Sequence, residues 1–342
     1  MKLTPMMQQY MDTKEQYKDC LLFFRLGDFY EMFFEDAKTA SKELEITLTG
    51  RDCGFGEKAP MCGVPWHSAH NYIAKLINKG YKVAICEQME DPSVAKGIVK
   101  REVTRVITPG TVTDPSMLED KKNNFLMVIY CQQTYFGIAV VDVTTAEFYA
   151  TQINYGNTYK KLYDEIYRYK PSEILVNGDF QKVISDKEFS EKTGVYVSVL
   201  EGEAFFRDEA IKRIESTVGE NVLKNQELAA VAAGALIYYL ISTQKTDLGH
   251  IHTIKPYQIE NYMMIDSSSR KNLELTETLR DRKKRGSLLW VLDKTTTAMG
   301  GRLLRKWIEQ PLLDVGEINK RLNAVEELKE KFMVRNEIME LL

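Results

Sequence analysis

An aromatic ring and a carboxylate stand two residues apart in the stretch "RLGDFYEMFFEDA", residues 25–37. In a β-strand, residues two apart project from the same face, so Phe29 and Glu31 are predicted to point together, with Tyr30 and Met32 on the other face. An exposed ring can wedge between base steps and unstack them. A carboxylate beside it repels phosphates and is tolerated where a base offers a donor or where the carboxyl is protonated. Two interpretations therefore stay open: an edge aromatic that packs on its neighbours, or a stacking probe with a hydrogen-bonding partner.

Two runs of basic residues have the composition of a phosphate-binding surface. The first run holds one acid, Glu102, and four cations: Lys96, Lys100, Arg101 and Arg105. The second run surrounds Asp281: Arg280, Arg282, Lys283, Lys284 and Arg285. Arg51, in a glycine-rich segment, is a further single cation. Such clusters contact phosphates, but each run is also typical of a solvated loop or face.

The acids and histidines indicate little enzymatic chemistry. Asp142 lies on a predicted strand with Glu147 soon after it, and a two-metal nuclease uses clustered carboxylates on such a sheet. One pair is not such a cluster, so the pattern favours a solvent-facing sheet edge, and magnesium-dependent cleavage is the test of the nuclease alternative. The histidines have no Cys or acidic partner at ligand spacing, so no metal site is expected: His67, His70, His250 and His252. Neither a G-x-x-x-x-G-K-[ST] phosphate loop nor a G-x-S-x-G nucleophile pattern occurs in the sequence.

Length and composition predict a soluble protein with several cores. The chain has 342 residues, 44% hydrophobic and 28% charged, and a net charge of −3, which gives no overall attraction to nucleic acid or membrane. Its five cysteines are odd in number and lack zinc-knuckle spacing, which fits reduced thiols in the cytoplasm. The N-terminus has no apolar signal region. The longest apolar run, residues 228–241, is shorter than the roughly 20 residues of a membrane span, so we predict a buried helix.

Periodicity divides the chain into three units. The first is mixed α/β: helices at 4–18, 35–49 and 66–80, a strand at 20–33 that breaks or bends near Gly27, a loop at 50–65, and strands at 81–88 and 101–111. The second is an open α/β sheet: strands at 123–132, 135–153 and 172–177, with helices at 158–171 and 225–244. From residue 270 onward the pattern is helical and stops without a closing element, as in a piece of a longer protein.

Four colinear segments carry a family resemblance. They are "FFRLGDFYEMFFEDA", "PMCGVPWHSAHNYIAKLINKGYKVAICEQMEDP", "VKREVTRVITPGT" and "NLELTETL…GSLLWVLDKTTTAMGGRLLRKWIEQPL", and they closely resemble the MutS family of DNA mismatch-recognition proteins, from about residue 4 to the end. The resemblance implies a multidomain α/β plus α fold. Residues 1–114 would form a mixed α/β mismatch-recognition domain, residues 115–248 a ribonuclease H-like α/β connector domain without catalysis, and residues 249–342 the N-terminal part of an all-α lever or core domain.

The resemblance also implies roles for individual residues. The Phe-x-Glu motif of the family falls on Phe29, Tyr30 and Glu31, where the Phe stacks on the mispaired base at a kinked site and the Glu hydrogen-bonds that base. Further residues are expected near the site or the DNA backbone: Leu26, Asp28, Arg51, Lys100, Arg101 and Arg105. The bound ligand would be mismatched or looped double-stranded DNA.

For the full-length protein, the resemblance implies an ATP-dependent homodimeric sensor that uses ATP and Mg²⁺. It also implies a MutL-type partner on the connector domain and a cytoplasmic, nucleoid-associated location. The ATPase of the family is not among these 342 residues, so the fragment is expected to be no enzyme and to hold no cofactor. The alternative is an interaction scaffold that binds protein partners without binding DNA in isolation.

Overall fold

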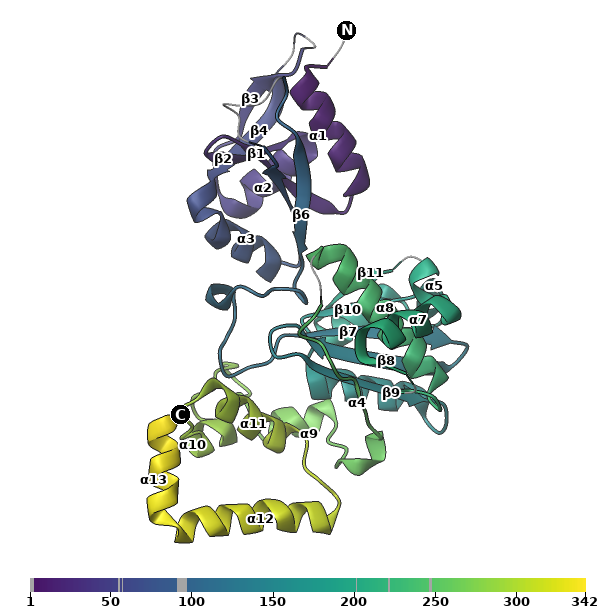
Figure 1. Cartoon of the computed structure of the whole chain (residues 1–342), viewed down its shortest axis with the longest axis vertical. Helices are drawn as coiled ribbons and strands as arrows, with labels where there is room; N and C mark the ends of the chain where they lie inside the picture. The colour runs from purple at the N-terminus through teal and green to yellow at the C-terminus, as the bar shows by residue number, and fades with distance from the viewer. Residues whose placement is uncertain are drawn as a thin grey trace. The chain divides into compact units, whose positions relative to one another are not determined.

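The computed structural model describes residues 3–54, 56, 58–90, 97–200, 202–220, 222–245 and 248–342 (Figure 1). The chain divides into two compact units, Met1–Val112 with Ile237–Gly249, and Thr113–Leu236 with His250–Leu342. Each unit has its own six-stranded sheet. The expected α/β plus α fold is therefore confirmed.

The first unit is a sheet between helices, in the order β3-β4-β2-β1-β5-β6. Its strands are β1 (Cys20–Leu26), β2 (Phe29–Phe33), β3 (Thr49–Asp52), β4 (Lys58–Pro65), β5 (Lys82–Gln88) and β6 (Arg101–Ile107). Its helices are α1 (Pro5–Gln16), α2 (Phe34–Leu44) and α3 (Ala69–Asn78), with a 3-10 turn, η1 (Trp66–Ser68), before α3. β1 and β5 are parallel, and the other neighbours are antiparallel.

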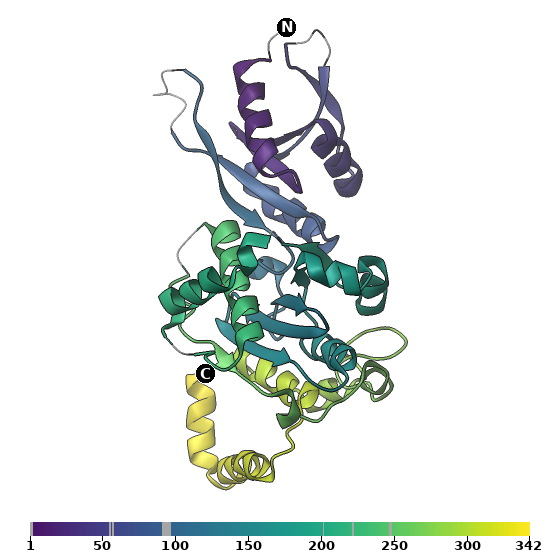
Figure 2. The same cartoon turned by 90° about the vertical axis from the view of Figure 1, so that its right-hand side faces the viewer.

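The two faces of this sheet are covered by different helices (Figures 1 and 2). Helix α1 packs Met7 and Tyr10 on the face that carries Leu22, Phe24 and Phe33. Helix α2 packs on the opposite face, where the Cys62 thiol donates to the Ala37 carbonyl at 3.4 Å. Both faces are therefore buried along most of β1 and β2.

The strand predicted at 20–33 is a hairpin. β1 pairs antiparallel with β2, and Gly27 with Asp28 forms the turn between Leu26 and Phe29. Gly27 has φ +60°, which glycine adopts without a steric penalty. The predicted break near Gly27 is thus a complete chain reversal.

The loop predicted at 50–65 is wrong, because most of it forms β3 and β4. Glycine and proline content indicated a loop, but three residues of β4 are buried: Ala59, Cys62 and Val64. Tertiary packing therefore overrides the local preference.

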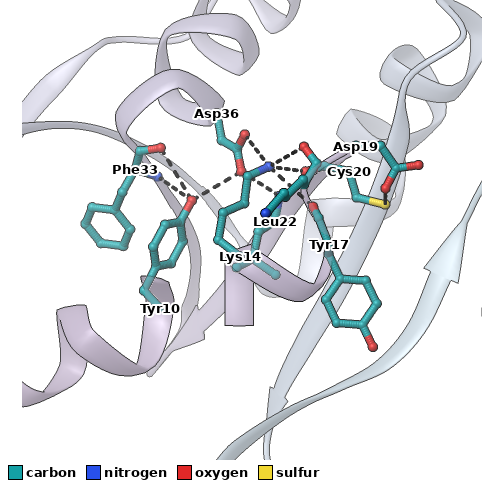
Figure 3. A network of polar contacts seen from close by, with 9 residues as sticks. Tyr10, Lys14, Tyr17, Asp19, Cys20, Leu22, Phe33 and Asp36 are labelled. Atoms are coloured by element: carbon teal, nitrogen blue, oxygen red, sulfur yellow. Dashed lines mark hydrogen bonds and ion pairs between the residues drawn. The ribbon is translucent and has the colours of Figure 1, made fainter. Parts of the chain in front are cut away.

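A buried carboxylate joins α1, β1 and α2 (Figure 3). β1 pairs with β2 only near the turn, so the N–H of Leu22 has no β2 partner. It donates instead to Asp36 Oδ2 at 3.0 Å, which also accepts from the Tyr10 hydroxyl at 3.2 Å. Lys14 Nζ lies 2.9 Å from Asp36 Oδ1, and the Phe33 N–H donates to the Tyr10 hydroxyl at 3.3 Å. This network fixes the end of β2 from which the hairpin projects.

The second unit contains the sheet β11-β10-β7-β8-β9-β12. Its strands are β7 (Phe125–Gln132), β8 (Tyr135–Asp142), β9 (Glu147–Ile153), β10 (Glu173–Val176), β11 (Tyr196–Val199) and β12 (Lys255–Pro256). β7 to β9 form an antiparallel meander, which parallel strands extend on both sides. The arrangement agrees with the ribonuclease H-like connector that the resemblance implied.

Helices surround this sheet and continue to the C-terminal end. Those of the α/β part are α4 (Thr158–Tyr169), α5 (Gly178–Val183), α6 (Asp186–Thr193), α7 (Arg207–Val218) and the first half of α8 (Glu227–Gln244), with 3-10 turns η2 (Pro115–Met117), η3 (Gly202–Phe205) and η4 (Ile259–Asn261). The second half of α8, from Ile237, belongs to the first unit. The later helices are α9 (Ser267–Asn272), α10 (Leu288–Leu292), α11 (Ala298–Glu309), α12 (Val315–Glu330) and α13 (Phe332–Leu341).

Helix α8 contains the longest apolar run and is a core helix, as predicted. By length and composition it is the one helix among the described residues that could cross a membrane, but 72% of it is buried inside the protein. It approaches β8 closely at Gly137, where a Cβ would lie 1.9 Å from the Leu228 carbonyl oxygen. This contact requires a glycine.

Candidate nucleic-acid interface

The tip of the β1–β2 hairpin carries the Phe29 and Glu31 pair. Phe29 lies opposite Leu26, and Glu31 lies opposite Phe24, so both side chains are on the face that α1 covers farther along the strand. Exposure rises toward the turn: Phe33 is fully buried, the Glu31 side chain is 16% exposed and Phe29 is 46% exposed. The same-face placement predicted from the sequence is confirmed, and the ring is not sealed in the core.

Arg51 of β3 forms an ion pair with Glu31 across the intervening strand β4. The residue opposite Glu31 on β4 is Gly63, and the one opposite Arg51 is Ala59. A Cβ at Gly63 would lie 3.3 Å from the Tyr30 carbonyl oxygen, closer than side chains usually pack, and in ordinary contact with Glu31 Cγ at 3.5 Å. Small residues on β4 therefore leave room for the pair.

The opposite face of the tip is held by aromatic and charged side chains. The Tyr30 hydroxyl donates to Glu87 of β5, and burial followed by this carboxylate raises the pKa of Tyr30. The Arg25 guanidinium lies 4.5 Å from the centre of the Trp66 ring and 3.7 Å from Glu87. The backbone N–H of Trp66 donates to the Asp28 carbonyl at 3.0 Å, and this bond connects the turn to η1. These contacts hold the hairpin tip on the face opposite the exposed Phe29 ring.

Five of the predicted site residues lie together on or beside the hairpin: Leu26, Asp28, Phe29, Glu31 and Arg51. Asp28 is exposed in the turn, and Leu26 is half-buried at the end of β1. Trp66, 48% exposed, is a residue of the tip that the sequence reasoning missed. Its position depends on the pairing of Phe29 with Pro65, which no local pattern predicted.

The first basic run does not act as one surface. Lys96 lies outside the described residues. Arg101 points into the protein: its guanidinium donates to the Arg25 carbonyl at 2.7 Å, to the Val99 carbonyl at 3.0 Å and to Gln9 Oε1 at 3.0 Å. Burial lowers the pKa of Arg101. Three acceptors therefore already occupy this guanidinium.

The other two residues of that run differ from Arg101. Lys100 is exposed and pairs with Glu102 at 2.6 Å. Arg105 is half-buried in the middle of β6, opposite Ile85. Their predicted contact with the DNA backbone stays a prediction.

The second basic run lies in an exposed loop of the second unit. Within it, Lys284 pairs with Asp293 and the Lys283 carbonyl accepts from the Thr278 N–H at 2.9 Å. Hydrogen bonds from Lys284 and Thr295 hold the pKa of Asp293 well below its usual range. This interaction stabilises the loop.

Asp142 has a structural use in the turn after β8. Its Oδ1 accepts from the Thr144 N–H at 2.9 Å and hydroxyl at 2.7 Å, and its Oδ2 accepts from Asn123 Nδ2 at 2.7 Å and the Asn124 N–H at 3.2 Å. In the part of the chain that the structure describes, no three His, Cys, Asp or Glu residues converge as metal ligands. The buried carboxylate closes a turn and does not face solvent, contrary to the predicted sheet edge.

Comparison with known proteins matches the chain to one family over most of its length. Residues 4–116 match MutS domain I, residues 124–252 match MutS domain II and residues 268–342 match MutS domain III. The three matches follow one another in domain order.

Curated relatives give the same result. DNA mismatch repair protein MutS of Acetivibrio thermocellus is 59% identical over 343 residues, which cover 99% of this chain and 39% of the relative. The protein of the same name from Ruminiclostridium cellulolyticum is 60% identical, again over 99% of this chain and 39% of the relative. That from Lachnoclostridium phytofermentans is 53% identical over 100% of this chain and 37% of its own length. This chain therefore spans about two fifths of these relatives, and it belongs to the MutS family of DNA mismatch repair proteins.

Proposed function

We propose that this chain binds mismatched or looped double-stranded DNA, with Phe29 as the stacking wedge and Glu31 as the acceptor for the displaced base. The observation that carries the proposal is the half-exposed Phe29 ring at a hairpin tip, beside a carboxylate on the same face. The names of the relatives, DNA mismatch repair protein MutS, support the kind of DNA involved.

The physical basis of recognition is the deformability of the base stack. A mismatched step unstacks at a lower cost than a paired step, by up to a few kcal/mol, so a rigid ring enters it more readily. The contacts of Tyr30, Arg25 and Trp66 behind the ring supply that rigidity. Phe29 thus reads how easily a step opens more than which bases form it.

The negative charge of Glu31 also contributes to the selection of mismatched duplex. A carboxylate near the DNA repels phosphates and needs a donor from a displaced base. Arg51 holds the carboxylate and offsets part of this repulsion. Paired duplex, which offers no displaced base, is then disfavoured more than mismatched duplex. Cations such as Lys100 and Arg105 would set the register on the backbone without reading sequence.

For the whole protein we infer further properties from the family. These are ATP binding with Mg²⁺ and ATP hydrolysis, a homodimer, a MutL-type partner on the connector domain, and a cytoplasmic, nucleoid-associated location. The 342 residues contain no G-x-x-x-x-G-K-[ST] loop, so we assign ATP to other parts of the whole protein.

The test compares a G·T-containing duplex with its fully paired counterpart at low salt, by fluorescence anisotropy. Wild type should favour the G·T duplex, and Phe29→Ala should lose about tenfold in affinity for it, because stacking on one base is worth about 1–3 kcal/mol. Leu48→Ala is the matched control, since Leu48 belongs to the same unit and is also 46% exposed. Equal, negligible binding of wild type to both duplexes would favour the interaction scaffold.

A further inference from the structure

A pocket in the second unit is lined by many cations and one acid, Glu309. It is open to solvent and lies where the end of α4, the segment before β7 and helix α11 meet. The cations are Lys122, Arg168, Lys170, Arg302, Arg305 and Lys306. Mismatch recognition at the hairpin uses none of them.

Arg168 is the buried base of this pocket, with 5% of its surface exposed. Its guanidinium donates to Glu165 at 3.1 Å and to Gln310 Oε1 at 3.0 Å, and it lies 3.9 Å from the centre of the Tyr262 ring. Its Nε has no acceptor among the described residues, and the same holds for the buried Nε of Arg305. A buried donor without an acceptor is unfavourable, so both groups can gain from an added oxygen ligand.

The ion pairs of the other lining cations are long. They are Lys122–Glu119 at 3.9 Å, Lys170–Glu277 at 3.8 Å, Lys170–Glu309 at 3.5 Å, Arg305–Glu309 at 3.6 Å and Lys306–Glu147 at 3.8 Å. The side chains of Glu119 and Glu277 are 77% and 51% exposed, and such pairs contribute little. Arg302 donates to a backbone carbonyl, that of Asp120, at 2.6 Å.

Helix ends offset only part of the positive charge of the pocket. α4 and α11 both end at the pocket, and each helix C-terminus carries about half a negative charge. Together with Glu309 these ends offset about two cations, and Glu165 offsets Arg168. About three of the six lining cations then remain, and their carboxylate partners outside the lining, Glu119, Glu147 and Glu277, lie 3.8–3.9 Å away. Burial lowers the pKa of Lys306 against the pull of Glu147.

We propose that this pocket binds a phosphate-bearing anion, with inorganic phosphate or diphosphate as the simplest form. Arginine presents a planar fork of donors that matches phosphate oxygens, and a multivalent oxyanion can accept from several donors at once. The bound anion would join α4 to α11, because Arg168 and Arg305 come from these two helices. The proposal is independent of Phe29 and of DNA recognition.

The experiment is a calorimetric titration of the chain with phosphate and with pyrophosphate at constant ionic strength. One saturable site is expected, and Arg305→Gln should weaken it about tenfold, because a charge-assisted hydrogen bond is lost. Arg305→Lys keeps the charge but not the fork of donors, so its affinity for the anion should lie between those of wild type and Arg305→Gln. Lys320→Gln on α12 is the control, since Lys320 is 75% exposed and pairs only with Glu317 among the described residues.

Two further measurements complete the test. Unfolding curves without ligand show whether each variant is folded, and in wild type the midpoint should rise with pyrophosphate by mass action. A paired DNA duplex is added as a competitor: displacement of pyrophosphate assigns the site to backbone phosphates, and no displacement assigns it to free phosphates. Absence of saturable binding, or equal binding by wild type and folded Arg305→Gln, overturns the proposal.

Discussion

The Arg51 guanidinium on β3 pairs with the Glu31 carboxylate on β2, across the glycine that β4 places opposite Glu31. The Arg51 side chain is 41% exposed and that of Glu31 is 16% exposed, so the pair is open to solvent on one side. It therefore contributes little to stability, about 0–1 kcal/mol. Under the proposed function, the main effect of the pair is on the charge that approaching DNA would meet.

The two partners of this pair should have different effects on DNA binding. Glu31→Gln removes the repulsion of phosphates, so binding to paired duplex should rise and the preference for G·T duplex should fall. Arg51→Gln removes a cation and leaves Glu31 unpaired, so binding to both duplexes should weaken. Anisotropy titrations of both variants and the double variant measure the coupling. Equal changes for both duplexes in Glu31→Gln would contradict the role of the carboxylate.

Asp36→Ala should destabilise the first unit. The substitution leaves Lys14 and the Leu22 N–H without their buried partner, which costs about 3 kcal/mol. Urea unfolding followed by tryptophan fluorescence at Trp66 reports on this unit, with Trp290 and Trp307 changed to Phe to remove the signal of the other unit. The neighbouring Glu35→Gln is the control, because Glu35 is 82% exposed and pairs only with Lys38 among the described residues. A midpoint equal to that of the control would show that the network is dispensable.

Arg101→Lys should reduce the stability of the folded protein, whether or not it also changes DNA affinity. A lysine cannot replace the fork that reaches Arg25 and Gln9, so we expect a loss of about 1–3 kcal/mol in the free energy of unfolding. Lys100→Gln should leave stability unchanged. If Lys100 contacts the backbone, this variant should lower the salt dependence of DNA binding by about one phosphate contact. If Arg101→Lys instead lowered the salt dependence of DNA binding and Lys100→Gln did not, the phosphate contact would belong to Arg101.

The thiols should resist alkylation in the folded protein. All five cysteines are buried and free. Burial raises the pKa of Cys62 and of Cys131 to about 11, and that of Cys20 and of Cys86 to about 12, so little thiolate is present near neutral pH. Intact-mass spectra after iodoacetamide at pH 8 should show an unmodified folded chain, whereas the chain in urea should gain five adducts. Rapid modification of the folded chain would show that a core opens.

The sequence by itself determined that Phe29 and Glu31 share one face of a strand, because side chains alternate along any strand. It also determined the α/β character of the chain and the buried helix α8, since these follow from the periodicity and length of apolar runs. The family resemblance was found in four colinear sequence segments, which are specific enough to indicate the family without the structure.

Only the tertiary structure decided which charges are available. Arg101 and Arg105 lie in one basic run, yet the guanidinium of Arg101 is directed inward by acceptors on Arg25 and Gln9, far away in the chain. Strands β3 and β4 form in the segment predicted as a loop because β4 pairs with β2 and β3 with β4, and this pairing places Arg51 beside Glu31. Such contacts join residues distant in sequence, and local composition carries no record of them.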